Sequence, residues 1–254
     1  MAFDIRSSIS TVSAQLDARP VDKRIGLVAL ATDHTTETDF ARLLQGQDVG
    51  VYVNRIGFEN PTTHESLLQT GPRLAEAVSD ILPDEPVDVL VYGCTAASVV
   101  LGNDTVAQHM NSAKPNTPCV TPSSAAFDAF DALGVKKISV LTPYTQDVTD
   151  SLVTYFSQNG PQVVNATCFG LSDDREMARL SRDSIIEAGV AACDPEADAL
   201  FVSCTAVRAA ACVEALEARL GKPVVTSNQA MVWRCMRHLG IVTDCPGGGS
   251  LFKL

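Results

Sequence analysis

The chain has 254 residues, 46% hydrophobic and 19% charged, a composition typical of a globular protein that buries a core. Its formal net charge of −11 argues against a nucleic-acid-binding protein, which would carry a basic surface. No apolar run approaches the roughly 18 residues needed to cross a bilayer, and the first residues lack the basic and apolar segments of a signal peptide. We therefore expect a cytoplasmic protein with no membrane and no nucleic acid among its partners.

Short apolar runs alternate with segments of helical spacing along the chain. The runs are rich in Val, Ile and Leu and mostly lack polar–apolar alternation, which is typical of strands buried on both faces of a parallel sheet. Several of the helical segments end at a glycine suited to a helix C-cap. This alternation predicts an α/β protein. The expected strands lie within 24–32, 48–56, 87–93, 114–122, 136–144, 161–170, 197–203 and 221–227, and the expected helices within 64–82, 123–134, 144–160, 172–193, 208–221 and 228–240.

The two halves of the sequence resemble each other. Segment 24–32 is similar to 137–145, "DVLVYGCTAAS" is similar to "DALFVSCTAVR", and 118–134 is similar to 223–240, in the same order. We therefore expect two α/β halves related by a pseudo-twofold axis. Because ligands bind beyond the carboxyl ends of parallel strands, the site should lie in the cleft between the halves. The predicted domains are 1–118 plus 223–254 for the first and 119–222 for the second.

Each half carries a Cys-Thr pair at the end of an apolar run, at Cys94 and at Cys204. A cysteine between a strand and a helix lies near free backbone N–H groups and the positive end of the helix dipole, both of which favour the thiolate. No histidine occupies a matching position, which weakens a Cys-His hydrolase interpretation. Two thiols on opposite faces of a carbon suit racemisation, or addition, rotation and elimination at a double bond. Neither reaction needs a cofactor.

The other six cysteines are interpreted as small packing residues. The chain is too long and apolar for a disulfide scaffold, so we expect reduced thiols. There is no Cys-x-x-Cys, and the four histidines form no ligand pattern with the cysteines, so no metal site is predicted. Two alternatives to catalysis by Cys94 and Cys204 stay open: a non-catalytic protein that binds a small molecule, and a redox pair that forms a disulfide.

The motifs resemble those of the aspartate/glutamate racemase superfamily, in the branch of maleate cis–trans isomerases, arylmalonate decarboxylases and the ectoine-utilisation protein A group. The resemblance covers about residues 20–245. It implies two Rossmann-like domains, each a mainly parallel four-stranded sheet flanked by helices. The motifs are "RIGLVALATDHTTETDF" (24–40), "VYGCTAAS" (91–98), "TPY" (142–144), "VSCTAVRA" (202–209) and "TSNQAMVW" (226–233).

The resemblance also implies roles for individual residues. In maleate isomerases the first cysteine adds to the double bond and the second protonates the neighbouring carbon, so Cys94 would be the nucleophile and Cys204 the acid and base. In racemases the two would exchange protons at one α-carbon, which makes an Asp/Glu-type amino-acid racemase the alternative function. Decarboxylases of this branch keep only the second cysteine. The implied substrate-binding residues are Thr95, Tyr144, Thr205, Ser227 and Asn228; Tyr144 also fits a turn, and Ser227 and Asn228 also fit a helix N-cap.

One position departs from the family pattern. Maleate isomerases typically read Pro-Ser-Ser-Asn-Thr after the first strand, whereas Asp33 stands here at the Asn position. An ionised Asp33 would repel a dicarboxylate and would suit an amine or amidine. This favours the ectoine-utilisation group, whose expected substrates are amino-acid-like. Asp33 or Thr35 also fits the cap of a helix that begins nearby.

Three arginines are candidates for a carboxylate clamp: Arg55, Arg73 and Arg208. Arg208 follows Cys204 by one helical turn. Exposure on a helix surface is the more common situation for arginine. We also expect a homo-oligomer, a dimer or tetramer, as is common among symmetric soluble enzymes.

Overall fold

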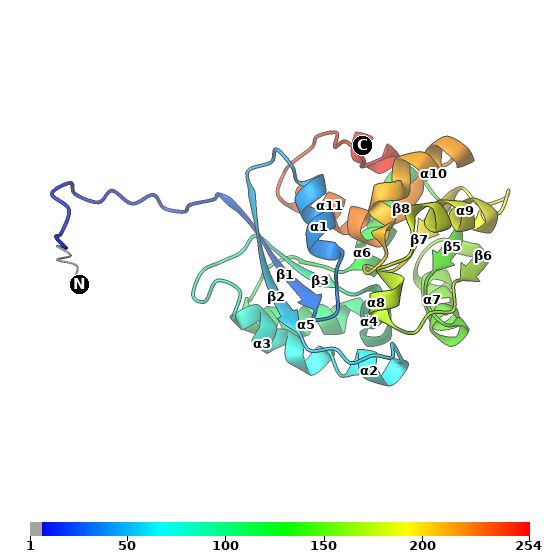
Figure 1. Cartoon of the computed structure of the whole chain (residues 1–254), viewed down its shortest axis with the longest axis horizontal. Helices are drawn as coiled ribbons and strands as arrows, with labels where there is room; N and C mark the ends of the chain where they lie inside the picture. Colours follow the sequence, from blue (N-terminus) through cyan, green and yellow to red (C-terminus); the bar gives the residue numbers. More distant parts are fainter. Residues whose placement is uncertain (1–6) are drawn as a thin grey trace, which may run out of the picture.

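The protein, in a computed structural model that describes residues 7–254, contains two four-stranded sheets (Figure 1). The first sheet has the order β2-β1-β3-β4 and the second the order β6-β5-β7-β8. All pairings are parallel, which confirms the predicted α/β class. The strands are β1 (Lys23–Leu30), β2 (Val49–Ile56), β3 (Val89–Gly93), β4 (Cys119–Val120), β5 (Lys137–Thr142), β6 (Gln162–Cys168), β7 (Ala199–Val202) and β8 (Val224–Thr226).

The two sheets have the same strand order, as the internal repeat predicts. Every expected apolar run contains one strand. The inner strands β1, β3, β5 and β7 are almost wholly buried, whereas β2 and β6 at the sheet edges are partly exposed. Burial on both faces explains the continuous apolar runs of the inner strands.

Helices flank both sheets, and three expected helical segments are divided: 64–82, 172–193 and 208–221, the last into a 3-10 helix and an α-helix. The Gly-Pro pair divides 64–82 into two α-helices joined by a short 3-10 turn. The segment 172–193, expected as one helix, is divided because Ser181 accepts from the Ser184 N–H and begins a new helix. The α-helices are α1 (Thr36–Leu43), α2 (His64–Leu68), α3 (Leu74–Ser79), α4 (Thr95–Leu101), α5 (Asn103–Ala113), α6 (Pro122–Leu133), α7 (Gln146–Asn159), α8 (Asp174–Met177), α9 (Arg182–Ala192), α10 (Val213–Leu220) and α11 (Ser227–His238); the 3-10 helices are η1 (Gly71–Arg73), η2 (Arg208–Cys212) and η3 (Ser250–Lys253).

The chain passes between the halves at the last strand of each sheet. Helix α6 follows β4 of the first sheet but packs on the second, where the rings of Phe130 and Phe201 meet edge to face at 5.7 Å. Helix α11 follows β8 of the second sheet but contacts α1, β3 and β4 of the first, as expected. The two crossing helices also pack on each other, with Arg234 Nε 2.7 Å from Asp128 Oδ2.

These crossings shift the strands relative to the predicted domain boundaries. The strand at 119–120 was expected in the second domain but pairs with β3 of the first sheet. The strand at 224–226 was expected in the first domain but pairs with β7 of the second. Backbone hydrogen bonds hold each terminal strand in its own sheet, and only the following helix changes sides. The division into two domains stays a prediction, because one continuous apolar core spans both halves.

None of the helices among residues 7–254 combines the length and the apolar character that a membrane-crossing segment needs.

The start of α11 offers a stability prediction. Thr226 and Gln229 form a capping box, in which the Thr226 side chain accepts from the Gln229 N–H and Gln229 Oε1 accepts from the Thr226 N–H. Loss of such a cap costs about 1 kcal/mol. We expect Thr226→Ala to lower the free energy of unfolding by about that amount in urea titration. Thr226→Ser removes only the methyl group and is the control; equal losses in both variants would contradict a role for the cap.

Candidate active site

The two Cys-Thr motifs lie at the carboxyl ends of equivalent strands. Cys94 follows β3 and is the N-cap of α4, and Cys204 stands two residues beyond the end of β7. Both residues are buried, with exposed fractions of 6% and 5%. They are close enough that the charge of Cys204 acts on the pKa of Cys94. The structure therefore brings the two predicted catalytic residues together, and all eight cysteines of the chain are free thiols.

Hydrogen bonds tie the two motifs to each other through Ser227. Thr95 Oγ1 donates to Ser227 Oγ at 2.9 Å, and the backbone N–H of Cys204 donates to the same oxygen at 3.1 Å. From the other side, Thr205 Oγ1 donates at 3.1 Å to the carbonyl of Gly93, the residue before Cys94. The hydroxyl groups of Thr95 and Thr205 thus both donate their hydrogen bonds to acceptors within the protein. Ser227 holds the motifs in place, and substrate binding by these hydroxyls stays a prediction.

The backbone at Cys204 is strained. Its φ angle is 94°, in the region that favours glycine. A non-glycine residue in such a conformation costs on the order of 1–3 kcal/mol and persists only where neighbouring contacts enforce it. Here the bond from the Cys204 N–H to Ser227 is one such contact. The equivalent residue Cys94 has a relaxed, extended φ of −147°, so the two motifs differ in backbone geometry.

Asn228 connects the second motif to the first half of the molecule. Its Nδ2 group donates to Asp39 Oδ2 and to the Thr205 carbonyl, both at 2.9 Å. A backbone carbonyl such as that of Thr205 can only accept a hydrogen bond. The Asn228 amide must therefore turn its nitrogen toward this carbonyl. Asp39, in α1, is buried, and this burial raises its pKa, against the lowering effect of the Asn228 hydrogen bond. Sequence reasoning identified Asn228 and missed Asp39.

Each thiol has a buried tyrosine beside it. Tyr144, which follows β5, is 2% exposed, and its hydroxyl lowers the pKa of the Cys204 thiol; its contact with a substrate carboxylate stays a prediction. Tyr92 lies in β3; burial, and then the nearby Cys94 thiol, raise its pKa well above 10.0. The Tyr92 hydroxyl donates to Thr70 Oγ1 at 2.8 Å. Tyr92 was not predicted, since a tyrosine inside an apolar strand reads as an ordinary core residue.

Asp33 both caps a helix and faces the thiols. Its Oδ1 accepts from the N–H groups of Thr35 and Thr36, and its Oδ2 from Thr36 Oγ1, all within 2.8 Å. The helix-cap interpretation is therefore confirmed for Asp33, whereas the Thr35 side chain makes no cap bond to α1. Burial raises the pKa of Asp33, and its charge in turn raises the pKa of Cys94 and Cys204. Whether it binds substrate stays a prediction.

A second buried carboxyl, Asp174 at the start of α8, approaches the same thiols from the other half. Its Oδ2 accepts from Thr32 Oγ1 at 2.8 Å, and its N–H donates to Asn60 Oδ1 at 3.1 Å. Burial, and next the nearby charge of Asp33, raises the pKa of Asp174 from 3.8 to about 6 against the Thr32 hydrogen bond. Sequence reasoning missed Asp174, because an acidic pair before a short helix also fits a solvated helix start.

The electrostatics of the thiols differ from the expectation. Burial, and then the charge of Asp174, raises the pKa of Cys94 well above 9.0 and that of Cys204 to about 12. A backbone N–H near each sulfur and the Tyr144 hydroxyl lower these pKa values but do not compensate. The predicted stabilisation of a thiolate is thus outweighed, and both thiols are neutral at pH 7 in this structure. Burial and two carboxylates dominate over the strand–helix geometry.

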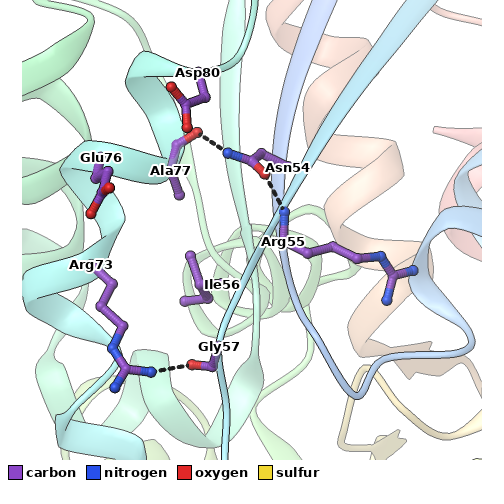
Figure 2. Close-up of a pocket in the computed structure, with 8 residues that line it drawn as sticks. All are labelled: Asn54, Arg55, Ile56, Gly57, Arg73, Glu76, Ala77 and Asp80. Atoms are coloured by element: carbon purple, nitrogen blue, oxygen red, sulfur yellow. Dashed lines mark hydrogen bonds between the residues drawn. The ribbon is translucent and has the colours of Figure 1, made fainter.

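The three candidate arginines are engaged elsewhere. Arg55 and Arg73 line a surface pocket of about 300 Å³, in which the Arg55 guanidinium points away from Arg73 (Figure 2). Arg55 pairs with Glu37 and donates at 2.8 Å to the carbonyl of Asp33, so it supports the loop that carries Asp33. Arg73 donates to a carbonyl within this pocket, and Arg208 donates to a carbonyl beyond α8. Their hydrogen bonds do not form a clamp at the thiols.

No cluster of three or more His, Cys, Asp or Glu side chains with suitable geometry occurs between residues 7 and 254.

Sequence comparisons relate the chain to two groups of enzymes. The profile of the arylmalonate decarboxylase family matches residues 82–252. The maleate isomerase of Alcaligenes faecalis is 24% identical over 246 residues, which cover 91% of this chain and 96% of that protein. The arylmalonate decarboxylase of Bordetella bronchiseptica is 30% identical over 138 residues, which cover 53% of this chain and 58% of that protein.

Solved structures of the same enzymes share the fold. The maleate isomerase Iso of Pseudomonas putida S16, as a cysteine-to-alanine mutant with maleate, matches with a TM-score of 0.83 at 24% identity, covering 91% of this chain and 97% of that one. A Nocardia farcinica maleate cis–trans isomerase mutant with a covalently bound succinylcysteine intermediate matches with a TM-score of 0.84 at 22% identity, covering 91% and 98%. The chain belongs to the arylmalonate decarboxylase family, in the maleate isomerase and arylmalonate decarboxylase branch of the Asp/Glu racemase superfamily.

Proposed function

We propose that the protein is a cofactor-independent isomerase that acts on a small carboxylate through Cys94 and Cys204. The observation that carries this proposal is the pair of buried thiols that follow equivalent strands of the two halves, in motifs joined by hydrogen bonds. A carbon held between them would have one sulfur on each face. The presence of both cysteines supports isomerisation over decarboxylation. The resemblance implies that decarboxylases of this branch keep only the second of the two cysteines.

For a substrate with a double bond, the reactive form of Cys94 is the thiolate, a minor form at pH 7 because burial raises the pKa of this thiol. This thiolate adds to one alkene carbon, a C–S bond forms, and the π electrons move to the neighbouring carbon. Cys204 gives its proton to that carbon, and the resulting single bond rotates. Cys204 then takes a proton back from the same carbon while the C–S bond breaks, which restores the double bond and the Cys94 thiolate.

Related enzymes support this direction. Two relatives that align with 91% of this chain are named maleate isomerases, and the solved structure of another maleate isomerase contains maleate. The succinylcysteine in the Nocardia farcinica structure is a covalent adduct on sulfur in that enzyme. An equivalent adduct here would form on Cys94.

The finer assignment is to the ectoine-utilisation group, and it rests on Asp33. A buried carboxyl stands where maleate isomerases have a neutral amide, so this chain and maleate are electrostatically mismatched. The same observation favours an Asp/Glu-type amino-acid racemase as the second candidate. In that reaction one cysteine removes the α-proton and the other donates a proton to the opposite face.

Incubation with candidate substrates in deuterated water tests these alternatives. With maleate and with each enantiomer of aspartate, NMR spectroscopy would detect cis–trans conversion or incorporation of deuterium at carbon. We expect wild-type enzyme to catalyse one of these reactions and Cys94→Ser and Cys204→Ser to lose it. Exchange retained in both variants would contradict the two-thiol mechanism, and binding without exchange would favour the non-catalytic alternative.

A further inference from the structure

Two buried carboxyls from opposite halves flank the thiol pair. Asp33 follows β1 in the first half, and Asp174 begins α8 in the second. Their exposed fractions are 4% and 6%. The charge of Asp174 is the strongest electrostatic influence on both Cys94 and Cys204, and Asp33 acts on both in the same direction. The thiols therefore lie in a field made by two acids.

Hydrogen bonds between the halves hold Asp174 in this position. Besides the bonds from Asp174 to Thr32 and Asn60, Asn60 Nδ2 donates to Asp173 Oδ1 at 3.2 Å, and the Thr62 N–H donates to the Ser172 carbonyl at 2.8 Å. This set of contacts makes Asp174 a fixed part of the closed site. Within the described part of the chain, Oδ1 of Asp174 accepts no hydrogen bond, so one carboxyl oxygen is available to a ligand.

A third acceptor nearby also lacks a donor. Oδ1 of Asn228 is buried and has no hydrogen-bond partner among residues 7–254, while its Nδ2 group is fully used by Asp39 and the Thr205 carbonyl. Asn228 adjoins Ser227, the residue that links the two Cys-Thr motifs. Buried acceptors are rarely left unpaired, so this oxygen indicates a ligand that carries N–H donors.

The neighbouring cations do not neutralise the two carboxyls. Arg55 is the cation that acts on Asp33, but its guanidinium is bonded to Glu37 and to backbone carbonyls. His34, which acts on Asp174, has an exposed side chain. A ligand that brings its own positive charge would offset the field and lower the pKa of both thiols.

We propose that Asp174 and Asp33 together bind a protonated nitrogen of the substrate, so that the site takes small carboxylates with an ammonium or amidinium group in preference to dicarboxylates without one. This assignment rests on the proposed function and makes Asp174 a determinant of specificity. A dicarboxylate would place a second negative charge beside two buried carboxyls, which is unfavourable in a site screened from water.

Calorimetric titration of the full-length chain near pH 7.5 with matched probes tests the proposal. The probes are β-alanine against malonate, and 4-aminobutyrate against succinate; each pair has equal carbon number and differs in the charge of one end. We expect wild-type protein to bind at least one ammonium probe about tenfold or more tightly than its matched dicarboxylate, the effect of one charge-assisted contact. Asp33→Asn/Asp174→Asn protein should lose or invert this preference.

The control variant is Glu187→Gln, which removes a surface carboxyl that pairs with Arg219 and takes no part in the contacts that hold Asp174. It should keep the wild-type preference. Equal or tighter binding of both dicarboxylates to wild type, no binding of either ammonium probe, or an unchanged preference in the double variant would overturn the proposal. Circular dichroism verifies that each variant is folded. Because binding is measured without turnover, these outcomes are independent of the deuterium-exchange result, which alone decides the two-thiol mechanism.

Discussion

Replacement of Cys204 with alanine is expected to lower kcat by about 10²–10⁴-fold, the contribution typical of a positioned acid or base. In the proposed cycle no other group is assigned to protonate the carbon next to the C–S bond. Cys94→Ala should reduce turnover at least as much, since it removes the nucleophile. For Cys204→Ser with an alkene substrate, we expect proteolysis and peptide mass mapping to detect a substrate adduct on the peptide that contains Cys94. Steady-state kinetics with the substrate found by deuterium exchange measures the losses.

Cys193→Ala is the matched control for these variants. Cys193 is a half-buried thiol at the end of α9, outside the contacts that join the two motifs. We expect its substitution to leave kcat within a factor of two, and circular dichroism to report a native fold for all three variants. Loss of less than tenfold in either Cys94→Ala or Cys204→Ala would exclude the corresponding thiol from the rate-determining chemistry.

Asp174→Asn is expected to stabilise the protein near neutral pH but not in acid. The pKa of Asp174 rises from 3.8 to about 6 on folding, so between these values the folded state binds more protons than the unfolded state. Stability therefore falls as the pH increases through this window, by about 3 kcal/mol in total. The variant lacks this penalty, so near pH 7 its Tm should exceed that of wild type by roughly 5–10 °C. Near pH 3.5 the two should coincide, as measured by differential scanning calorimetry.

Asp173→Asn should give the opposite sign. The hydrogen bond and charge of Arg175 lower the pKa of Asp173 to about 2, so its ionisation favours the folded state above the unfolded pKa, and this small contribution disappears as the pH falls. The variant should therefore be slightly less stable than wild type near neutral pH. A stability difference between Asp174→Asn and wild type that does not change with pH would contradict the assignment of a raised pKa to Asp174.

The expected stabilisation bears on the role of Asp174. A carboxyl that lowers stability at the working pH is commonly retained for function, since activity and stability compete at many active sites. Cys204 adds a second example, because its positive φ also disfavours folding. Both features lie at the thiol pair. Two features that disfavour folding thus lie where the chemistry is proposed.

Much of the fold was predictable because its signals are local. Each inner strand is a short run of Val, Ile and Leu, and burial on both faces requires such a run. The repeat then predicted two sheets of equal topology, as observed. The interruption at Ser181 was missed, since a serine inside a polar helical segment is ambiguous between a cap and a surface position. The sheet membership of 119–120 and 224–226 was missed because each strand pairs with the preceding strand while the helix that follows it packs on the other half.

The candidate site was predictable only in part. Cys94, Cys204, Tyr144 and Asp33 each follow a strand of a parallel sheet, and the carboxyl ends of such strands converge on one edge. Asp174 follows a loop and begins a helix of four residues, so its position depends on bonds to Thr32 and Asn60 of the other half. No hydrophobic periodicity or sequence motif predicts that Asp174 lies near residues of the other half.

The sequence by itself determined the α/β class, the duplicated order of strands and the two cysteines at matching strand ends, since these follow from hydrophobic periodicity and from similarity within the chain. Tertiary structure alone decided which charges surround the thiols. A pKa depends on burial and on nearby charges. The nearby charges here belong to Asp33 and Asp174, which are more than a hundred residues apart in the sequence. Strand–helix geometry predicted a thiolate, whereas burial, and then the charges of Asp174 and Asp33, raise the pKa of both thiols and keep them neutral at pH 7.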